Sequence, residues 1–458
     1  MNYATLFKNK CSLKANVGII GANGGFGYSF LAQVPLMEDS LSLRAICDLD
    51  ANKSMELLKM LGYDSSRFYP CSTKEEIAEH IQEKDAIIIL EDGLLLPFCG
   101  IDVLVEATGV PETSSKMAEN ALLHDIHVCM VSKEADCVSG PYLYNLASSR
   151  NLVYAITAGD QPANLIQFLS WVELLGLEVI AAGKSSEYDF IYDLDSAEFT
   201  YQDRHDTLPD LAKHWHLDGM GTLKERSKIL HSFPQFAVPD YCEMNVVANA
   251  TGLIPSSDRF HYPICKVSEL ANIFIPVEDG GVLAKTGVVD VFNNLRRPDE
   301  ASFAGGIFVI VKCHNKKVWD LLLEKGHIVS RNGKYACMYL PYHFMGVEAP
   351  VTVVNAFKLG LSTYSKCEHI AVMSSTAARD FKAGEKLSLT GHHRLIDDVD
   401  VSLVCKEELP KDVAPYYLLA EKTLTKDVSK GSLFTLDMID FSDSELFRMY
   451  KESLDEQV

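Results

Sequence analysis

The sequence predicts an α/β protein with a Rossmann-type, doubly wound parallel sheet, a central α+β domain and a small C-terminal all-β module. Apolar strand-like segments alternate with helix-like segments over the first 160 residues, as such a sheet requires. The first strand-like segment breaks into a glycine-rich turn, and a basic–Asp–apolar–x–x–Gly pattern occurs twice near the C-terminus, 47 residues apart. A chain of 458 residues is expected to hold two or three domains. We place them at residues 1–160, 161–364 and 365–458.

The glycine-rich turn lies in residues 17–27, which read VGIIGANGGFG. Gly21, Gly24 and Gly27 stand at G-x-x-G-x-x-G spacing, where they would make the turn, admit a pyrophosphate to the backbone and let the following helix pack on the sheet. The helix N-terminus would face the phosphates with its unpaired amides. The turn therefore predicts a dinucleotide site, against the alternative of a turn without a ligand. Its further candidate contacts are Asn23, Gly25 and Phe26.

The second strand-like segment, residues 43–48, ends in Asp48, 21 residues after Gly27. A carboxylate at this place meets the ribose hydroxyls of the adenosine. Because a carboxylate repels a 2′-phosphate, Asp48 favours NAD, whereas the nearby Lys53 leaves NADP open. The sequence therefore predicts NAD or NADP as cofactor, with NAD preferred.

The other elements continue the alternation. Further strands are expected at residues 85–90, 103–107, 127–131 and 152–156, with helices at 52–61 and 112–124 between them. Beyond residue 160 we expect a helix at 165–175, a strand at 178–182, loops and short helices at 192–234, a helix at 241–250, a strand at 306–311 and a helix at 347–360 that returns to the first domain. Residues 378–389 and 425–436 carry the repeated pattern, which predicts two edge turns with a positive-φ glycine, unless the similarity is chance.

Three strand ends carry the candidate contacts at the nicotinamide end. Ligands of open α/β sheets bind beyond the carboxyl ends of the strands, and small residues there let backbone amides approach. Thr108 and Gly109 follow one strand, Ser132 and Lys133 the next, and residues 158–163 the third. Solvated polar loops are the alternative interpretation. In the third loop we assign Asp160 and Gln161 to the substrate.

Lys184 is the candidate catalytic residue, because it follows a buried strand and a glycine and would project into the cleft. Partial desolvation would lower its pKa and suit it to proton exchange with a substrate hydroxyl or carbonyl, with Glu243 orienting it. A solvated surface lysine is the alternative. Tyr188 and Asn249 are further substrate candidates, although the polar face that carries Asn249 could equally form an internal hydrogen-bond network. His343 is either a substrate contact or a structural histidine.

The composition of the chain argues against several classes of binding partner. The formal net charge of −21, from 42 basic and 63 acidic residues, argues against nucleic acid. The twelve scattered cysteines, with no C-x-x-C pair, suggest a reducing compartment. No leader or apolar run of 18 residues is present, so we expect a cytoplasmic protein without membrane contact. No metal is predicted, since the pairs His214-x-His216 and His392-His393 lack carboxylates at a convincing spacing.

A set of motifs carries a family resemblance. It comprises the glycine-rich strand, residues 106–112 (EATGVPE), 159–163 (GDQPA), 182–184 (AGK), 247–253 (VANATGL) and 341–344 (PYHF), in this order. The chain resembles the homoserine dehydrogenase-like oxidoreductases that end in a small SAF domain, a group that includes 1-deoxy-D-xylulose 5-phosphate reductoisomerase-like enzymes. The resemblance implies a catalytic and dimerisation domain, a SAF-like final module, NAD(P)-dependent hydride transfer, a homodimer, and a catalytic or substrate-binding role for Lys184.

The chain also departs from that group. Residues 236–239 (FAVP) replace Asp-Gly-Thr-Lys, so Pro239 stands for a lysine, and Glu187 replaces a second lysine after Lys184. Losing two cations makes a phosphorylated sugar less favoured. The leading hypothesis is an NAD(P)-dependent oxidoreductase, or a reductoisomerase, for a small polar hydroxy or keto compound such as a polyol, sugar acid or sugar phosphate. The alternatives are a catalytically weak dinucleotide-binding protein and homoserine dehydrogenase proper.

Overall fold

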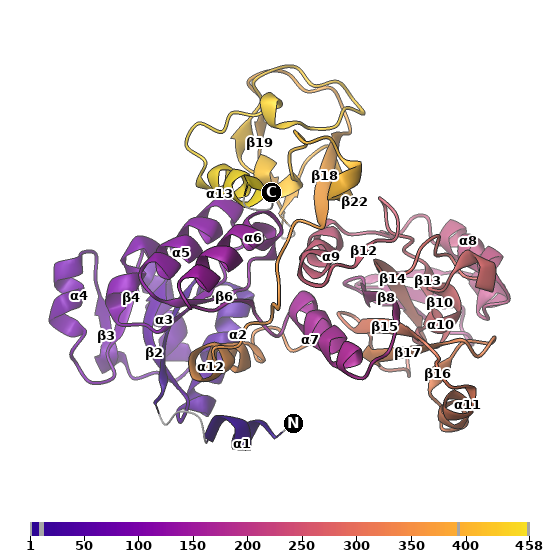
Figure 1. Cartoon of the computed structure of the whole chain (residues 1–458), viewed down its shortest axis with the longest axis horizontal. Helices are drawn as coiled ribbons and strands as arrows, with labels where there is room; N and C mark the ends of the chain where they lie inside the picture. Colours follow the sequence, from indigo (N-terminus) through magenta and orange to yellow (C-terminus); the bar gives the residue numbers. More distant parts are fainter. Residues whose placement is uncertain (1, 9–12, 392–393, 456–458) are drawn as a thin grey trace.

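The computed structural model describes residues 2–8, 13–391 and 394–455 and arranges the chain in three parts (Figure 1). The first part comprises the first 160 residues. It begins with the short helix α1 (Tyr3–Lys8) and is built on a parallel sheet. A central part with a mixed sheet lies beside it. The third part, orange to yellow in Figure 1, lies above both.

The first part is built on a seven-stranded sheet of order β3-β4-β2-β1-β5-β6-β7, in which every neighbouring pair is parallel. Its order reverses at β1, which places the ligand crevice between β1 and β5. This confirms the predicted doubly wound sheet; the edge strand β3 was not predicted. The strands are β1 (Ala15–Ile20), β2 (Leu41–Cys47), β3 (Phe68–Pro70), β4 (Ile87–Leu90), β5 (Val103–Glu106), β6 (His127–Met130) and β7 (Tyr154–Ile156).

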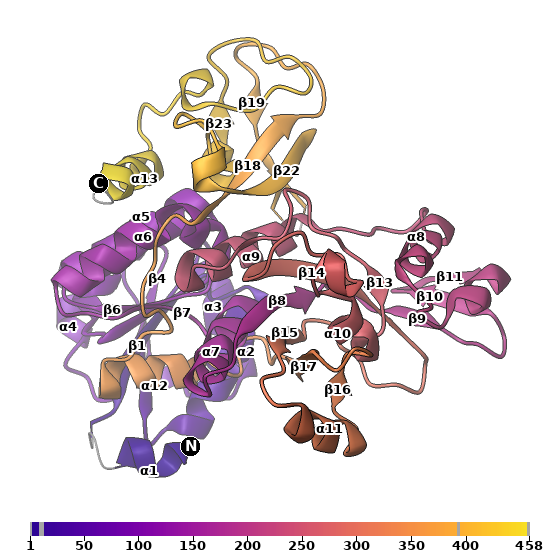
Figure 2. The same ribbon diagram turned by 45° about the vertical axis from the view of Figure 1, so that its right-hand side comes forward.

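Helices cover both faces of this sheet. They are α2 (Gly25–Gln33), α3 (Ala51–Met60), α4 (Lys74–His80), α5 (Pro111–Leu123), α6 (Lys133–Ser149) and, from much later in the chain, α12 (Ala349–Leu359). One core includes Leu104, Val128 and Leu122, and the other includes Val17, Val105 and Val353. Helix α12 contacts β1, β5, β6 and β7, and it lies against the Rossmann part in both views (Figure 2). The chain therefore returns from the central part to complete the first sheet's cover.

The central part has a mixed sheet of order β11-β10-β9-β14-β8-β15-β17-β16. Helices α7 and α9 pack together and against β8, β14 and β15. Between residues 192 and 234, where loops and short helices were expected, the structure also has the hairpin β10–β11. The bounds are α7 (Gln161–Leu174), β8 (Val179–Ser185), β9 (Phe190–Tyr192), β10 (Glu198–Tyr201), β11 (Arg204–Thr207), α8 (Met220–Ile229), α9 (Val238–Thr251), β12 (Ile254–Pro255), β13 (Ile264–Cys265), α10 (Leu270–Ile273), β14 (Val288–Arg296), β15 (Ile307–Lys312), α11 (Lys316–Glu324), β16 (Ile328–Val329) and β17 (Tyr335–Leu340).

The C-terminal part is a small antiparallel β region that ends in a helix. Its longest pair is β18–β22, and helix α13 packs on α5 and α6 of the first part. The elements are β18 (Ala371–Ala377), β19 (Lys386–Leu387), β20 (Leu389–Thr390), β21 (Leu395–Ile396), β22 (Val399–Cys405), β23 (Lys422–Thr423) and α13 (Glu445–Asp455).

The repeated sequence pattern forms two turns that bind each other reciprocally. The N–H of Ala383 donates to Asp427 Oδ1 (2.9 Å), and the N–H of Lys430, which is the equivalent residue, donates to Asp380 Oδ1 (2.7 Å). Phe381 and Val428 exchange backbone hydrogen bonds in the same way. Both pattern glycines, Gly384 and Gly431, have positive φ, at 88° and 82°. The two turns therefore have a local two-fold relation.

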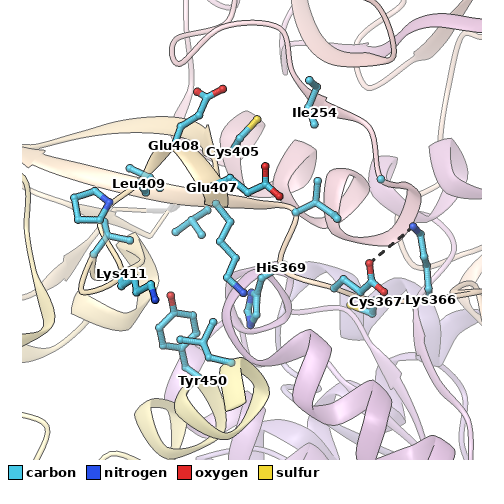
Figure 3. Close-up of a pocket in the computed structure, with 18 of the residues that line it drawn as sticks. Ile254, Lys366, Cys367, His369, Cys405, Glu407, Glu408, Leu409, Lys411 and Tyr450 are labelled. Carbon is cyan, nitrogen blue, oxygen red and sulfur yellow. Dashed lines mark ion pairs between the residues drawn. The ribbon is translucent and has the colours of Figure 1, made fainter. Parts of the chain in front are cut away.

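A cavity of about 1110 Å³ opens where the three parts meet (Figure 3). Lys366 and His369 of the linker, Glu407 after β22 and Tyr450 of α13 line it from different elements. Lys366 pairs with Glu368 at 3.9 Å. The linker between the second and third parts thus forms part of the lining of this cavity.

Candidate active site

The glycine turn has the backbone that a dinucleotide site needs. Gly21 directly follows β1 and has a φ of 81°, and a Cβ there would lie 2.3 Å from the carbonyl oxygen of Ala107. A Cβ at Gly27 would lie 2.5 Å from the carbonyl oxygen of Ala22. Gly24 is different, because a Cβ there would have no neighbour closer than 3.5 Å and no side chain caps the helix. The space over Gly24 and the first amides of α2 therefore fits a pyrophosphate.

Asp48 lies beside this turn at the carboxyl end of β2. Its Oδ2 accepts the N–H of Asn23 and its Oδ1 accepts the N–H of Leu49, both at 2.8 Å. The Asn23 side chain is held in turn by Ser54 Oγ, at 3.2 Å from its Oδ1. Phe26 packs into the apolar core, and Gly25 faces the tip of Met345 in the loop before α12. These bonds hold the Asp48 carboxylate beside the glycine turn.

The loops after β5 and β6 are fixed by a buried carboxylate. Glu106 Oε1 accepts the N–H of Thr108 at 3.0 Å and its hydroxyl at 2.7 Å, and the N–H of Gly109 donates to Ser132 Oγ at 2.8 Å. Burial raises the pKa of Glu106. The hydroxyls of Thr108 and Ser132, expected at the nicotinamide ribose, are therefore engaged within the protein. They shape the backbone that faces the cleft.

A buried cluster of charges joins the first two parts. Lys184, at the end of β8, donates to Asp240 Oδ1 at 2.7 Å and to Glu243, both on α9. Lys133, at the start of α6, pairs with the other oxygen of Glu243 and, at 3.3 Å, with Asp160. Glu243 thus bridges a lysine from each part. Only Lys133 and Asp160 are appreciably exposed, at 18% and 17% of their side chains.

This environment overturns one expectation for Lys184. Burial by itself would lower its pKa, but the charges of Asp240 and Glu243 outweigh burial and hold its pKa above the usual range. The same balance raises the pKa of Lys133, through Asp160 and Glu243. Both amines are therefore cationic at neutral pH. Lys184 is enclosed rather than projecting into the cleft, because its two carboxylate partners lie on α9 directly beside it.

Of the other predicted site residues, Asp160 belongs to the ion cluster, and the rest lie outside it. Asp160 caps α7 and touches Lys133, while His343 Nδ1 lies 3.2 Å from the carbonyl oxygen of Gly305, next to Gln161. Tyr188 lies against the ring of Tyr201, with 6.0 Å between ring centres.

Asn249, expected at the substrate, instead accepts the N–H groups of Ile370 and Ala371 through its Oδ1, at 2.9 and 3.2 Å. It belongs to the internal network that holds the linker, because its face of α9 points toward β18.

Sequence reasoning missed three members of the cluster's surroundings. Asp240 was not among the candidate site residues, yet it is buried and binds Lys184, Ser186 Oγ (2.8 Å) and Tyr262 OH (3.1 Å). A signal was present, because Asp240 precedes Glu243 by one helical turn. Lys184 and Ser186 likewise stand two residues apart, a spacing that puts both on one face of a strand. Nothing in the sequence pointed to Tyr262.

The described part of the chain has neither a metal-binding cluster nor a membrane-spanning helix. Within it, no group of three or more His, Cys, Asp or Glu side chains could hold a metal ion. His392 and His393 lie outside the described residues. None of the described helices is long and apolar enough to cross a membrane.

Residues 159–349 match the family described as the catalytic domain of oxidoreductase DRL. The match begins just before α7 and ends at the start of α12, so it spans the central part, including Lys184 and Glu243. An oxidoreductase catalytic domain therefore occupies this stretch of the chain. No curated protein sequence matches the chain.

Several solved structures share features of the fold. A dipicolinate-bound dihydrodipicolinate reductase from Paenisporosarcina sp. is 11% identical, with 76% of this chain and 97% of that chain covered and a TM-score of 0.35. A DOX-P reductoisomerase in complex with magnesium is 13% identical, covering 53% and 59%, with a TM-score of 0.31. An inositol dehydrogenase homologue from Azotobacter vinelandii, complexed with NADH and myo-inositol, is 21% identical, covering 41% and 45%, with a TM-score of 0.25. Such distant likenesses say nothing about the substrate.

Proposed function

We propose that the protein is an NAD(P)-dependent oxidoreductase for a small polar hydroxy or keto compound. One observation carries the proposal: the ion cluster of the catalytic domain reaches, through Glu243 and Lys133, the same edge of the Rossmann sheet that carries the glycine turn. A cofactor bound along that edge would end beside a cationic amine. The match of residues 159–349 to an oxidoreductase catalytic domain supports the same reaction class.

The chain offers a complete set of groups for the cofactor. The amides of residues 21–27 would hold the pyrophosphate, Asp48 the adenosine ribose, and the backbone at Thr108, Gly109 and Ser132 the nicotinamide end. A bound NAD(P) would supply or accept the hydride. We keep the preference for NAD, because the Asp48 carboxylate would repel a 2′-phosphate and Lys53 lies one turn into α3.

The two lysines would take different roles in this proposal. Lys133 is the partly exposed cation, so its Nζ would polarise the substrate carbonyl and donate the proton to the developing alkoxide. Glu243 would orient Lys133, and water at the exposed side of Lys133 would return the proton to its amine. Lys184 would hold Glu243 ionised and in place, since the two lysines lower the pKa of Glu243 in spite of burial. Asp160 and Gln161 would contact the substrate, with His343 beside them.

Binding and turnover of the full chain test this function. We expect NADH to bind at least as tightly as NADPH, and a tenfold preference for NADPH would refute the NAD assignment. Oxidation or reduction is followed at 340 nm with polyols, sugar acids, their phosphates and homoserine. If the cofactor binds but no compound shifts the absorbance, the protein is a dinucleotide-binding protein without this activity.

A pair of lysine variants locates the chemistry. Lys133→Met should lower kcat/KM at least a hundredfold, while the Kd for the cofactor changes less than threefold. Lys116→Met is the matched control, because Lys116 is an exposed lysine on α5 of the same part. Equal activity in the two variants would show that Lys133 has no part in the mechanism.

We also propose that the protein is a homodimer. Light scattering of the purified chain measures its molar mass in solution directly.

A further inference from the structure

We propose that Arg394 of the C-terminal part binds the diphosphate group of the dinucleotide cofactor. The inference rests on the proposed function, because it needs a dinucleotide in the cleft of the Rossmann sheet. It adds a cation to the groups assigned to the cofactor, and it gives the C-terminal part a direct role in cofactor binding. In both views this part lies above the first part (Figures 1 and 2).

Arg394 extends from the C-terminal part to the loop that follows β5. It directly precedes β21, and its Nη2 donates to the carbonyl oxygen of Thr108 at 3.4 Å. The guanidinium also lies over Gly109, where a Cβ would stand 3.7 Å from Nε and 3.8 Å from Nη2 of Arg394. Both loop residues are assigned to the cofactor in the proposed function. An arginine that is 286 positions away from Thr108 in the sequence therefore lies at the edge of the cofactor cleft.

The loop beneath Arg394 is in contact with the glycine turn. A Cβ at Gly21 would lie 2.3 Å from the carbonyl oxygen of Ala107 and 2.7 Å from the nitrogen of Thr108, so the two backbones touch. The glycine turn is the segment whose amides would hold the diphosphate. Arg394 therefore meets the cleft beside the diphosphate position. Asp48, which is assigned to the adenosine ribose, follows β2 on the other side of β1.

The guanidinium of Arg394 has donors to spare for an anion. It offers five N–H groups, and among the described residues its side chain bonds only to the carbonyl oxygen of Thr108 and forms no ion pair. At 3.4 Å this bond is longer than the usual N–H···O range of about 2.7–3.2 Å. The planar, always charged group can pair with two oxygens of a phosphate at once. A phosphate is therefore a better partner for it than the carbonyl it now contacts.

The C-terminal part does not need Arg394 to dock on the first part. Glu112 stands in the first turn of α5, directly after the loop beneath the arginine. Three groups of the C-terminal part donate to its carboxylate: Lys422 Nζ at 2.8 Å, Ser444 Oγ at 2.8 Å and the N–H of Leu446 at 3.1 Å. These contacts fix the C-terminal part beside the loop without using the guanidinium of Arg394.

The hairpin β20–β21 that carries Arg394 is also fixed. The N–H of Ile396 donates to the hydroxyl of the buried Tyr416 at 2.6 Å. On the other strand, the N–H of Leu389 donates to Glu421 Oε1 at 2.8 Å. The arginine therefore extends from an anchored backbone, and its ordering on a ligand costs less free energy than that of a side chain on a moving loop.

The segments that would flank the diphosphate carry no cation of their own. Residues 15–33, which include β1, the glycine turn and α2, contain no lysine or arginine, and neither do residues 107–115. The net charge of −21 opposes the approach of an anionic cofactor. Helices α2 and α5 contribute to cores on opposite faces of the sheet, and the C-terminal part docks on α5. The amides of α2 and the guanidinium of Arg394 would thus hold the diphosphate from opposite sides.

Calorimetric titration of the full chain with NADH, ADP-ribose and adenosine tests this contact without turnover. ADP-ribose keeps the diphosphate but lacks the nicotinamide, and adenosine lacks both. We expect Arg394→Met to raise the Kd for NADH and for ADP-ribose at least tenfold, because a charge-assisted contact is lost, and to change the Kd for adenosine less than twofold. Arg394→Lys should give an intermediate loss, since it keeps the charge but not the two-pronged geometry.

The matched control is Lys430→Met, which removes one positive charge from an exposed position of the same part. Its Kd values should stay within twofold of the wild type. Equal losses in Lys430→Met and Arg394→Met would overturn the inference, because they would show a general effect of charge. So would an unchanged Kd for ADP-ribose in Arg394→Met, or an equal loss for adenosine, which would show a damaged site.

Two results separate this inference from the proposed function. If the wild-type chain binds neither NADH nor NADPH, both are overturned. If it binds cofactor and Arg394→Met binds it equally well, only the role of Arg394 is overturned. With an anionic compound that turns over, a tenfold rise in KM at unchanged cofactor Kd would assign Arg394 to the substrate and exclude the diphosphate. Loss of ADP-ribose binding in Arg394→Met, in a protein that turns over no compound, would support the inference and count against catalysis alone.

Discussion

At the scale of single residues, Lys184 shows how neighbours reverse an expectation drawn from burial. An isolated buried lysine would lose its proton more easily, but Lys184 has Asp240 and Glu243 at its amine. Removing one member of such a cluster leaves the others buried without compensation. The residue therefore matters first for the integrity of the cluster and only through it for chemistry.

We predict that Lys184→Met lowers the free energy of unfolding by about 3–5 kcal/mol at pH 7, because it leaves buried carboxylates without their cation. Lys184→Met/Glu243→Gln should lose less than the sum of the two single changes, since the pair is removed together. Urea-induced unfolding of the wild type, the two single variants and the double variant gives the four free energies of this double-mutant cycle. Strict additivity would contradict the ion cluster.

Gly24 allows the cofactor site to be tested without harming the fold. A methyl group there meets no protein atom closer than 3.5 Å, but it occupies the space assigned to the pyrophosphate. We predict that Gly24→Ala leaves Tm within about 2 °C of the wild type and raises the Kd for NADH at least tenfold. Gly27→Ala is the contrast, because its methyl would lie 2.5 Å from a carbonyl oxygen and should lower Tm as well. Unchanged affinity in Gly24→Ala would argue against the site.

At the scale of elements, the sequence predicted the Rossmann strands well because they are buried on both faces. Segments such as Ile87–Leu90 and Val103–Glu106 are continuous apolar runs apart from a terminal residue, which is typical of parallel strands. The hairpin β10–β11 escaped prediction because its strands, EFTY and RHDT, are largely polar and exposed. Its pairing is set by the neighbouring β9 rather than by an apolar pattern of its own.

The two reciprocal turns of the C-terminal part should respond alike to the same change. Gly384 and Gly431 have positive φ with no atom within 4 Å of a new Cβ, so Gly→Ala at either place costs backbone strain alone, about 1 kcal/mol. Hydrogen exchange of β18 and β22 reports this loss. Gly221→Ala, in open space on α8 without a positive φ, is the control and should not destabilise the protein. A loss at only one of the two turns would contradict their equivalence.

At the scale of the whole molecule, the candidate site was predictable only where it is local in sequence. The glycine turn and Asp48 follow from a short stretch of chain. The partners of Lys184 do not, because Asp240 lies 56 residues away and its role depends on how α9 packs beside β8. The role of Asn249 was left open for the same reason: whether a polar helix face meets a substrate or a linker depends on what the C-terminal part covers.

The junction of the three parts should make stability depend on pH. His369 is buried in this junction, with Nε2 at 2.8 Å from Ser453 Oγ, and burial, aided by the charge of Lys406, lowers its pKa to about 3. The unfolded chain takes up a proton near pH 6.5 and the folded chain does not, so stability falls as the pH drops below 6.5. We predict that His369 alone lowers the free energy of unfolding by about 2 kcal/mol between pH 7 and pH 5. The difference in urea stability between wild type and His369→Gln should shrink by that amount; equal pH slopes would contradict the assignment.

Helix α12 decides when the first part of the molecule can finish folding during synthesis, because the ribosome makes this helix long after the strands on which it packs. The apolar face of β1 and β5 packs against Val353 and its neighbours, so one side of the parallel sheet, on which α2 and α3 also pack, is only partly covered until the ribosome has passed residue 359. A fragment that stops near residue 160 would expose that side to water and tend to aggregate. Expressed domains of this protein therefore need the helix grafted back, or the chain kept whole.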